Sequence, residues 1–234
     1  MNRNKSARER RVTFSPVFIL MAVLFCTCLI ISNLIASKVF VLLGVTLPAA
    51  VIVFPISYIL NDCLSEVYGF RYARLVIWMG FFMNFFVVLV TQLAILLPGA
   101  PFWDGDQAFR AIFGVTPRAT LASLLAFLAG STLNAWVMSR MKVSQKGRNF
   151  WLRAIVSSLV GECADSLIFI PIMFWAMGFK AVVTMMVCQV SAKVIYEIII
   201  LPITKRVVNH VKRIEGIDTY DTNISYDPFK ILDI

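Results

Sequence analysis

Long apolar stretches alternate with short polar ones along the whole chain. Runs of about 20 apolar residues match the length that a helix needs to cross a hydrocarbon core about 30 Å thick. Six such runs can be read, at 16–36, 48–68, 72–97, 118–139, 152–176 and 181–203. The pattern therefore predicts an all-α polytopic membrane protein with six transmembrane helices.

The spans divide the chain into three parts and leave no room for a soluble domain. We expect a basic N-terminal tail at 1–15, a six-helix transmembrane domain at 16–203 and a C-terminal tail at 204–234. "GVTLPAA" and "LPGAPFWDGD" are predicted outer loops, because their prolines and glycines mark turns. The segment "EGIDTYDTNISYDPFK" is polar and is predicted to be partly disordered. The first apolar run is of spanning length and lacks a small-residue cleavage site, which argues against a cleaved signal peptide.

Composition supports a membrane protein, and the charge distribution orients it. The chain is 59% hydrophobic and 15% charged, with mean hydropathy +0.81. Seventeen of the 22 lysines and arginines fall in the two tails and the second and fourth loops with their flanks. Only Lys38, Arg110, Arg118 and Lys180 fall on the other side. The positive-inside rule therefore predicts cytoplasmic N- and C-termini. Because this rule accounts for the net charge of +9, nucleic acid is not expected as a partner.

Five acidic residues interrupt the apolar spans. A charge at the centre of a transmembrane helix costs about 2.5–3.5 kcal/mol on insertion scales, so such residues must face the bundle interior, pair or line water. Spacings of three or four residues place the neighbouring acids of the second and fifth spans on shared helix faces. The five are Asp62, Glu66, Glu162, Asp165 and Glu197.

Other polar residues in the spans extend this pattern to one polar core. Gln189, Lys193 and Glu197 follow one face of the sixth span at four-residue spacing. Amides at Asn33, Asn61 and Asn134 lie in the first, second and fourth spans. Two structural alternatives stay open, in which the asparagines only join helices and Lys193 forms only a buried ion pair. Lys38 has the further alternative of reaching back to the outer surface.

The core carries more acids than cations. Five acids and one lysine would carry four excess negative charges if all were ionised. Desolvation and like-charge repulsion both favour the protonated carboxyl. We therefore expect that at least one carboxyl couples proton movement to substrate movement.

No cofactor, metal site or catalytic site is expected. His210 is the only histidine, and the five cysteines form no CxxC pair. GxGD, HExxH and GxSxG motifs are absent from the sequence, which argues against intramembrane catalysis.

The six spans suggest a 3+3 inverted repeat. Asn33 precedes Asp62 and Asn134 precedes Asp165 by similar intervals, so an amide-to-acid pair recurs in the two halves. Repeats of this kind with a binding site between them are common in transporters.

Several blocks of the sequence resemble the queuosine precursor transporter family, which is also grouped with vitamin uptake transporters. They are "SNLIASKVF", "FPISYILNDCLSEVYGFRYAR", "GSTLNAWVMSRMK", "RAIVSSLVGECADSLIFIPIMF" and "KVIYEIIILPITKRVV", and the resemblance covers about residues 18–213. It implies a six-helix importer of 7-cyano-7-deazaguanine or a related deazaguanine in the bacterial inner membrane. The polar residues that match the family's blocks are Asn33, Lys38, Asn61, Asp62, Ser65, Glu66, Asn134, Glu162, Asp165, Ser166, Lys193 and Glu197.

The chemistry of these residues agrees with such a ligand. A deazaguanine presents N–H donors, which an ionised carboxylate such as Glu162 or Asp165 accepts. Asn61, Asn134 or Gln189 could meet its carbonyl group. The aromatic stacking candidates are Tyr58, Trp136, Phe169 and Tyr196.

Other functions remain open at this point. The chain could be the substrate-binding membrane subunit of an ATP-driven uptake system, or a proton-coupled carrier for another nucleobase-like or vitamin-like solute. A cation or drug exporter would also use membrane carboxylates. The sequence also leaves open whether the protein is a homodimer.

Overall fold

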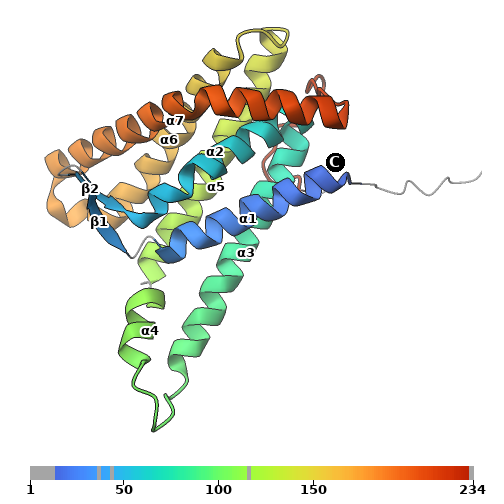
Figure 1. The fold of residues 1–234 in the computed structure, drawn as a ribbon. Helices are drawn as coiled ribbons and strands as arrows, with labels where there is room; N and C mark the ends of the chain where they lie inside the picture. Colours follow the sequence, from blue (N-terminus) through green and yellow to red (C-terminus); the bar gives the residue numbers. More distant parts are fainter. Residues whose placement is uncertain (1–13, 36–37, 43–44, 115–116, 232–234) are drawn as a thin grey trace, which may run out of the picture.

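The fold is all-α and polytopic, as predicted. A computed structural model describes residues 14–35, 38–42, 45–114 and 117–231, so nearly all of the predicted tail at 1–15 lies outside it. Within these residues, five helices are long and apolar enough to cross a membrane (Figure 1). They are α1 (Pro16–Ile35), α3 (Phe70–Leu96), α5 (Pro117–Ser144), α6 (Phe150–Phe174) and α7 (Phe179–Glu215).

The predicted span at 48–68 is not one continuous α-helix and is not among the five candidate membrane spans. The segment consists of a 3₁₀-helix η1 (Ala49–Ile52), the helix α2 (Phe54–Cys63) and a π-helical turn η2 (Leu64–Tyr68). A proline stands in the first turn of α2, where no amide hydrogen bond is required. The segment nevertheless runs back along α1 from one end of the bundle to the other (Figure 1).

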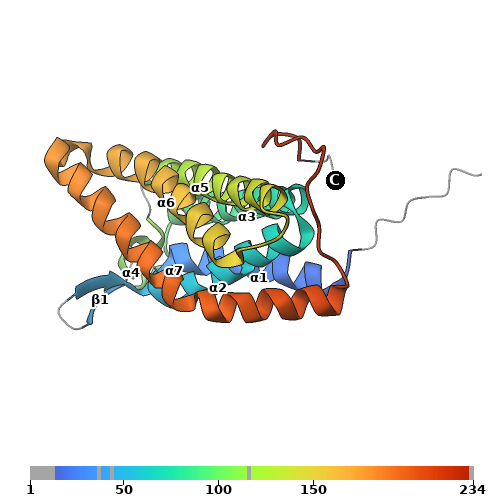
Figure 2. The ribbon, with the colours of Figure 1, turned by 90° about the horizontal axis from the view of Figure 1, so that it is seen from above.

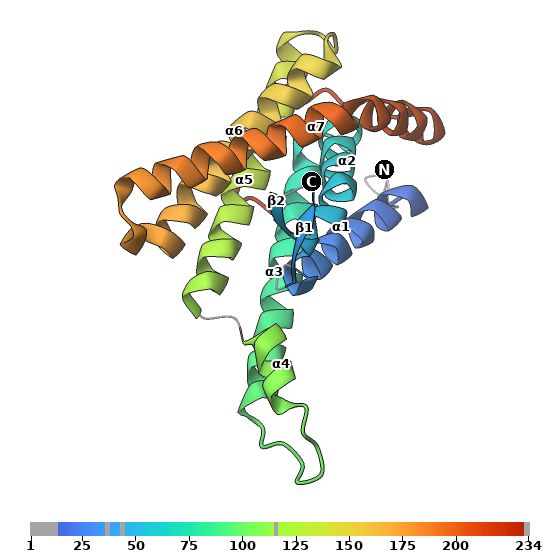
Figure 3. The same ribbon diagram turned by 60° about the vertical axis from the view of Figure 1, so that its left-hand side comes forward.

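Two small elements lie where only outer loops were predicted. Strands β1 (Val39–Leu42) and β2 (Val45–Pro48) form an antiparallel hairpin with Val39 opposite Pro48. Helix α4 (Asp106–Phe113) packs against the end of α3, where Gln92 Nε2 donates to the carbonyl of Phe113 at 2.8 Å. Figure 3 shows α4 and the end of α3 extending beyond the other helices.

Apolar side chains divide between a core and an outer surface that suits lipid. Phe18, Val67 and Phe70 are buried where α1, η2 and α3 meet. In contrast, Phe86 and Leu93 of α3 are 61% and 55% exposed. Large exposed apolar residues along a spanning helix are expected in a bilayer, because lipid tails replace water as the solvent.

Both ends of the described chain lie beside the start of α3. The ring of Phe14 packs edge-on against Tyr72, with 6.3 Å between ring centroids. Arg74 donates to the carbonyl oxygens of Ser225 and Asp227 at 3.3 and 2.7 Å. We call this end of the bundle, which also holds the turn between α5 and α6, the basic end. If both described ends lie on one side of the membrane, the number of crossings is even, so we expect the broken segment 49–68 to make the sixth.

The C-terminal region is ordered, which corrects the expectation of partial disorder. Helix α7 continues to Glu215, well beyond the predicted end of its span at 203. Residues 216–231 then turn back over the ends of α3 and α5 (Figure 2). The inverted repeat stays a prediction. The two halves differ in one connection: a β-hairpin joins α1 to α2, whereas the corresponding helices α5 and α6 are joined by the short turn at 145–149.

Candidate functional site

A chain of hydrogen bonds joins four helices in the middle of the bundle. Asn61 Nδ2 of α2 donates to Asn134 Oδ1 of α5 at 2.8 Å. Asn134 Nδ2 donates to Ser158 Oγ of α6 at 3.1 Å, and Ser158 Oγ donates to Glu197 Oε1 of α7 at 2.5 Å. All four side chains are buried. We call these four residues the amide relay; it brings together three of the predicted site residues and adds Ser158.

Two glycines allow this approach of α5 to α6. A Cβ placed on Gly161 would lie 2.8 Å from the carbonyl oxygen of Gly130 and 2.9 Å from Asn134 Cβ. Small residues let transmembrane backbones come close enough for short polar side chains to bridge them. The asparagine on α5 and the serine on α6 therefore meet directly.

Two predicted acids, one in the relay and one beside it, have no cation partner among the described residues. Glu197 is 2% exposed, and its Oε2 atom is buried without a hydrogen-bond partner. Asp62, next to Asn61, is also 2% exposed and has an unpartnered Oδ2 atom. Glu197 and Glu66 both lie within electrostatic range of Asp62. Buried charge without a partner is costly, so at least one of these carboxyls is expected to carry a proton in this conformation.

A second group, which we call the lysine cluster, lies one turn further along α6 and α7. Lys193 Nζ lies 2.5 Å from Glu162 Oε2 and 3.0 Å from Asp165 Oδ2. The three side chains are 12–24% exposed, which makes the cluster less enclosed than the relay. Lys193 thus forms the ion pair that the sequence left open as an alternative, with one cation between two carboxylates.

Glu66 belongs to a different environment from the other acids. Its Oε1 atom lies 2.6 Å from Arg153 Nη2, 2.8 Å from Lys212 Nζ and 3.8 Å from Lys142 Nζ. Asp218, from the segment after α7, lies 2.5 Å from Lys142 Nζ and 2.8 Å from Lys212 Nζ. We call these five residues the Glu66 cluster. The expected four excess negative charges were an overestimate, because Glu66 is matched by cations from three other helices.

The three groups form one polar column through the bundle. Along α6, Arg153 of the Glu66 cluster lies at the basic end, Ser158 of the relay follows, and Glu162 and Asp165 lie furthest inward. Helix α7 runs the opposite way and carries Lys193, Glu197 and Lys212 in the matching order. Arg153 and Asp165 are twelve positions apart, which corresponds to about 18 Å along α6, compared with about 30 Å for the hydrocarbon core of a membrane.

Other predicted site residues lie outside this column or at its edge. Asn33 Nδ2 donates to Asn84 Oδ1 at 3.0 Å, which joins α1 to α3 away from the relay. Gln189 is partly buried one turn before Lys193. Ser65 and Ser166 are buried with unpartnered hydroxyls.

The aromatic candidates differ in exposure. Trp136 is 38% exposed and faces outward, so it does not line the column. Phe169 and Tyr196 are partly buried on α6 and α7, and Phe169 packs against Phe174 with ring centroids 6.4 Å apart. The side chain of Tyr58 lies outside what the structure describes.

Sequence reasoning missed the cations around Glu66. The three cations Lys142, Arg153 and Lys212 are separated from Glu66 by 76, 87 and 146 residues. In the sequence they count among the loop and tail cations of the positive-inside pattern. No local spacing pairs residues so far apart. A signal did exist for Arg153, since it lies inside the fifth predicted span's first turn rather than in the loop.

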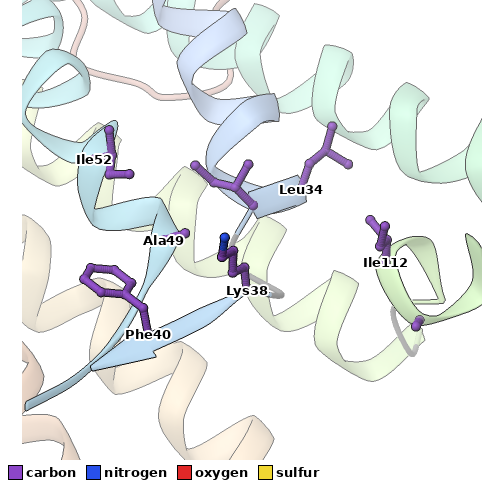
Figure 4. A pocket seen from close by; sticks show the side chains of 8 residues that line it. Leu34, Lys38, Phe40, Ala49, Ile52 and Ile112 are labelled. Atoms are coloured by element: carbon purple, nitrogen blue, oxygen red, sulfur yellow. The ribbon is translucent and has the colours of Figure 1, made fainter. Parts of the chain in front are cut away.

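Two cavities lie outside the polar column. The larger, about 830 Å³, is an open hollow at the end opposite the basic end, between α1, the hairpin, η1 and α4. Figure 4 shows Lys38 pointing into it, with Phe40 and Ile52 to one side and Leu34 and Ile112 to the other. The smaller, of about 30 Å³, adjoins Asn33 and Asn84. Neither of these two cavities is lined by residues of the polar column. The four side chains of the amide relay are buried in this conformation.

Comparisons with known proteins agree with this architecture. Residues 48–207 match the family model described as "Putative vitamin uptake transporter". The chain is 32% identical over 144 residues to the "Probable queuosine precursor transporter" of Bacillus subtilis (strain 168), covering 61% of this chain and 63% of that protein. It is 28% identical over 122 residues to the "Queuosine precursor transporter" of Escherichia coli (strain K12), covering 52% of each chain.

The matched part thus spans between about half and two thirds of these relatives' lengths. No solved structure matches the chain. The family model covers α2, α3, α5 and α6 and most of α7, which carry the whole amide relay and the lysine cluster. The chain, a multi-pass membrane protein, therefore belongs to the vitamin uptake transporter family.

Proposed function

We propose that the protein is a secondary carrier that imports a queuosine precursor, 7-cyano-7-deazaguanine or a related deazaguanine, across the bacterial inner membrane. The names of the two similar proteins support this substrate class. The family match supports a carrier rather than an enzyme. The polar column inside a helix bundle is the feature of this chain that carries the proposal.

The column offers hydrogen-bonding groups that suit a flat heterocycle with donors on one edge. The carboxyl groups of Asp62 and Glu197 would accept N–H bonds, since an ionised carboxylate is acceptor-only. The side-chain amides of Asn61 and Asn134 can both donate and accept hydrogen bonds. Each could therefore exchange its hydrogen bond to the other for one to the ring carbonyl of the ligand. The relay would open to admit the ligand, and its four side chains would exchange partners rather than lose them.

Proton movement follows from the same two acids. In this conformation Asp62 and Glu197 have no cation beside them among the described residues. Protonation would therefore remove the free-energy cost of burying their negative charge. In an outward-open state, one acid of the pair would take up a proton while the other, ionised, accepts the ligand's N–H groups. Ligand and proton would then leave together at the cytoplasmic end. Import of the ligand would then be linked to protonation of this pair, with Glu162 and Asp165 held by Lys193.

Restoration of queuosine synthesis tests this function. Cells that neither make nor import the precursor would receive this chain and low external precursor, and queuosine would be assayed in their tRNA. We expect the native chain to restore the modification, and Asp62→Asn and Glu197→Gln to abolish it at equal protein level. Asp104→Asn, at an exposed acid of the outer loop, is the matched control.

Uptake by the purified chain in liposomes separates a carrier from a subunit of an ATP-driven system. Precursor accumulation that requires an inward proton gradient would support the proposal. Normal restoration by both acid variants, or uptake in cells but none in liposomes, would contradict it.

A further inference from the structure

The segment after α7 is attached to the basic end by a series of specific bonds. Asp221 Oδ2 accepts from the amide of Phe70 at 2.7 Å and from Ser139 Oγ at 2.5 Å. The amide of Thr219 donates to the carbonyl of Val67 at 3.1 Å. Further along, Trp78 Nε1 donates to the carbonyl of Pro228 at 2.7 Å. We call residues 216–231 the strap.

The bundle is shaped to receive the strap. Gly69 adopts φ +85°, a conformation that side-chain-bearing residues rarely adopt. A Cβ at this position would also lie 2.6 Å from Asp221 Oδ1 and 2.9 Å from Thr219 Cγ2. Asp221 is 7% exposed although it lies in a segment without helix or strand. Burial of a loop carboxylate against a backbone amide indicates a docked element rather than a trailing end.

The strap covers the Glu66 cluster, where four helical segments meet. Glu66 comes from η2, Lys142 from α5, Arg153 from α6 and Lys212 from α7. Lys142 Nζ also donates to the carbonyl oxygens of Glu66 and Thr219, at 2.5 and 2.8 Å. Asp218 of the strap binds the two lysines. The strap therefore ties together the helices that would have to separate for the polar column to open at this end.

We propose that the Glu66 cluster and the strap form the gate of the basic end, which the charge distribution predicts to be cytoplasmic. This inference rests on the proposed carrier function, because a carrier must open and close at this end in every cycle. Release of the strap removes Asp218 from Lys142 and Lys212, which loosens α5 and α7 around Glu66. Glu66 is then a gate residue rather than a ligand-binding residue.

A native thiol provides a reporter for this gate. Cys63 is the last residue of α2, one turn before Glu66, and is fully buried against η2 and α7. A protein that retains only this cysteine would be treated with a hydrophilic maleimide in inside-out membrane vesicles. Asp221→Ala and a chain that ends at Gly216 would be compared with the otherwise native protein. Asp227→Ala is the matched control, because that side chain is exposed and, within the described part of the chain, accepts a hydrogen bond only from the nearby amide of Phe229.

We expect both strap variants to label faster, and the control to label at the native rate. A rise in the open population from about 1% to about 10% would speed labelling about tenfold. A second reporter that retains only Cys26, buried on α1, distinguishes opening from unfolding, since it must stay protected. Native labelling rates in both strap variants, or equal acceleration in the control, would overturn the proposal. Labelling needs no ligand, so this result stands apart from whether the chain carries a deazaguanine.

Discussion

At the scale of single residues, the intramembrane acids divide by what lies beside them. Glu66 has cations from three helices, Glu162 and Asp165 share Lys193, and Asp62 and Glu197 have no cation partner in the described part of the chain. Similar carboxyl groups therefore have different tasks. The first binds cations of three helices, the second group shares one lysine, and the last pair is the one to which we assign protons and ligand in the proposed function.

This division predicts unequal costs of neutralising two glutamates. Glu66→Gln would leave Arg153, which is fully buried, without its counter-ion and should destabilise the protein by about 3–5 kcal/mol. Glu162→Gln should cost much less, because Lys193 keeps Asp165. Unfolding of both purified variants in the same detergent would measure the difference. Equal losses would show that Glu66 is not the central counter-ion of its cluster.

At the scale of elements, the strap depends on an ionised carboxylate outside the membrane spans. Burial alone would raise the pKa of Asp218, but hydrogen bonds from Lys142 and Lys212 and their charges outweigh it and lower that pKa below its ordinary value of 3.8. A group with a lowered pKa in the folded state contributes stability above its ordinary pKa. That contribution is lost as the pH falls through the lower folded value.

The strap should accordingly be indifferent to pH in the neutral range. We expect Asp218→Asn to melt a few degrees below the native protein at pH 7 and at pH 5. The difference should shrink only below about pH 4, where the unfolded carboxyl also takes up its proton. Melting curves across this range measure it, with Asp227→Asn as the control. A difference that vanishes already near pH 6 would contradict the assigned partners of Asp218.

At the scale of the whole molecule, residues 14 and 231, which bound the described part of the chain, lie at the same end of the bundle, although only five helices in that part are long enough to span. We expect the segment of η1, α2 and η2 to supply the missing crossing. Its broken geometry places Asn61, Asp62 and Glu66 at successive levels of the polar column. Irregular backbone at membrane depth is tolerated where it is buried in protein, as η2 is.

Reporter fusions test this topology. A green fluorescent protein joined to either end should fluoresce, and alkaline phosphatase at either end should be inactive, because both ends are expected in the cytoplasm. Alkaline phosphatase inserted in the outer loop at 98–105 should be active. Opposite behaviour of the two termini would mean that residues 49–68 do not cross the membrane.

The sequence by itself determined the fold class, the positions of the five long helices and the set of intramembrane acids. These depend on local properties, namely the length of apolar runs and the cost of charge in lipid. It also left Lys193 as the one cation within the interiors of the predicted spans, with Glu162, Asp165 and Glu197 all open as its partners.

Only the tertiary structure decided which acid meets which partner. Lys142 and Lys212 match loop and tail cations in the sequence, yet they reach Glu66 across 76 and 146 residues. The strap is polar enough to be predicted as partly disordered, but a glycine at position 69 and two hydrogen bonds to Asp221 hold it in place. Pairings between distant segments depend on how helices pack, and a pattern of residue types along one chain does not contain that information.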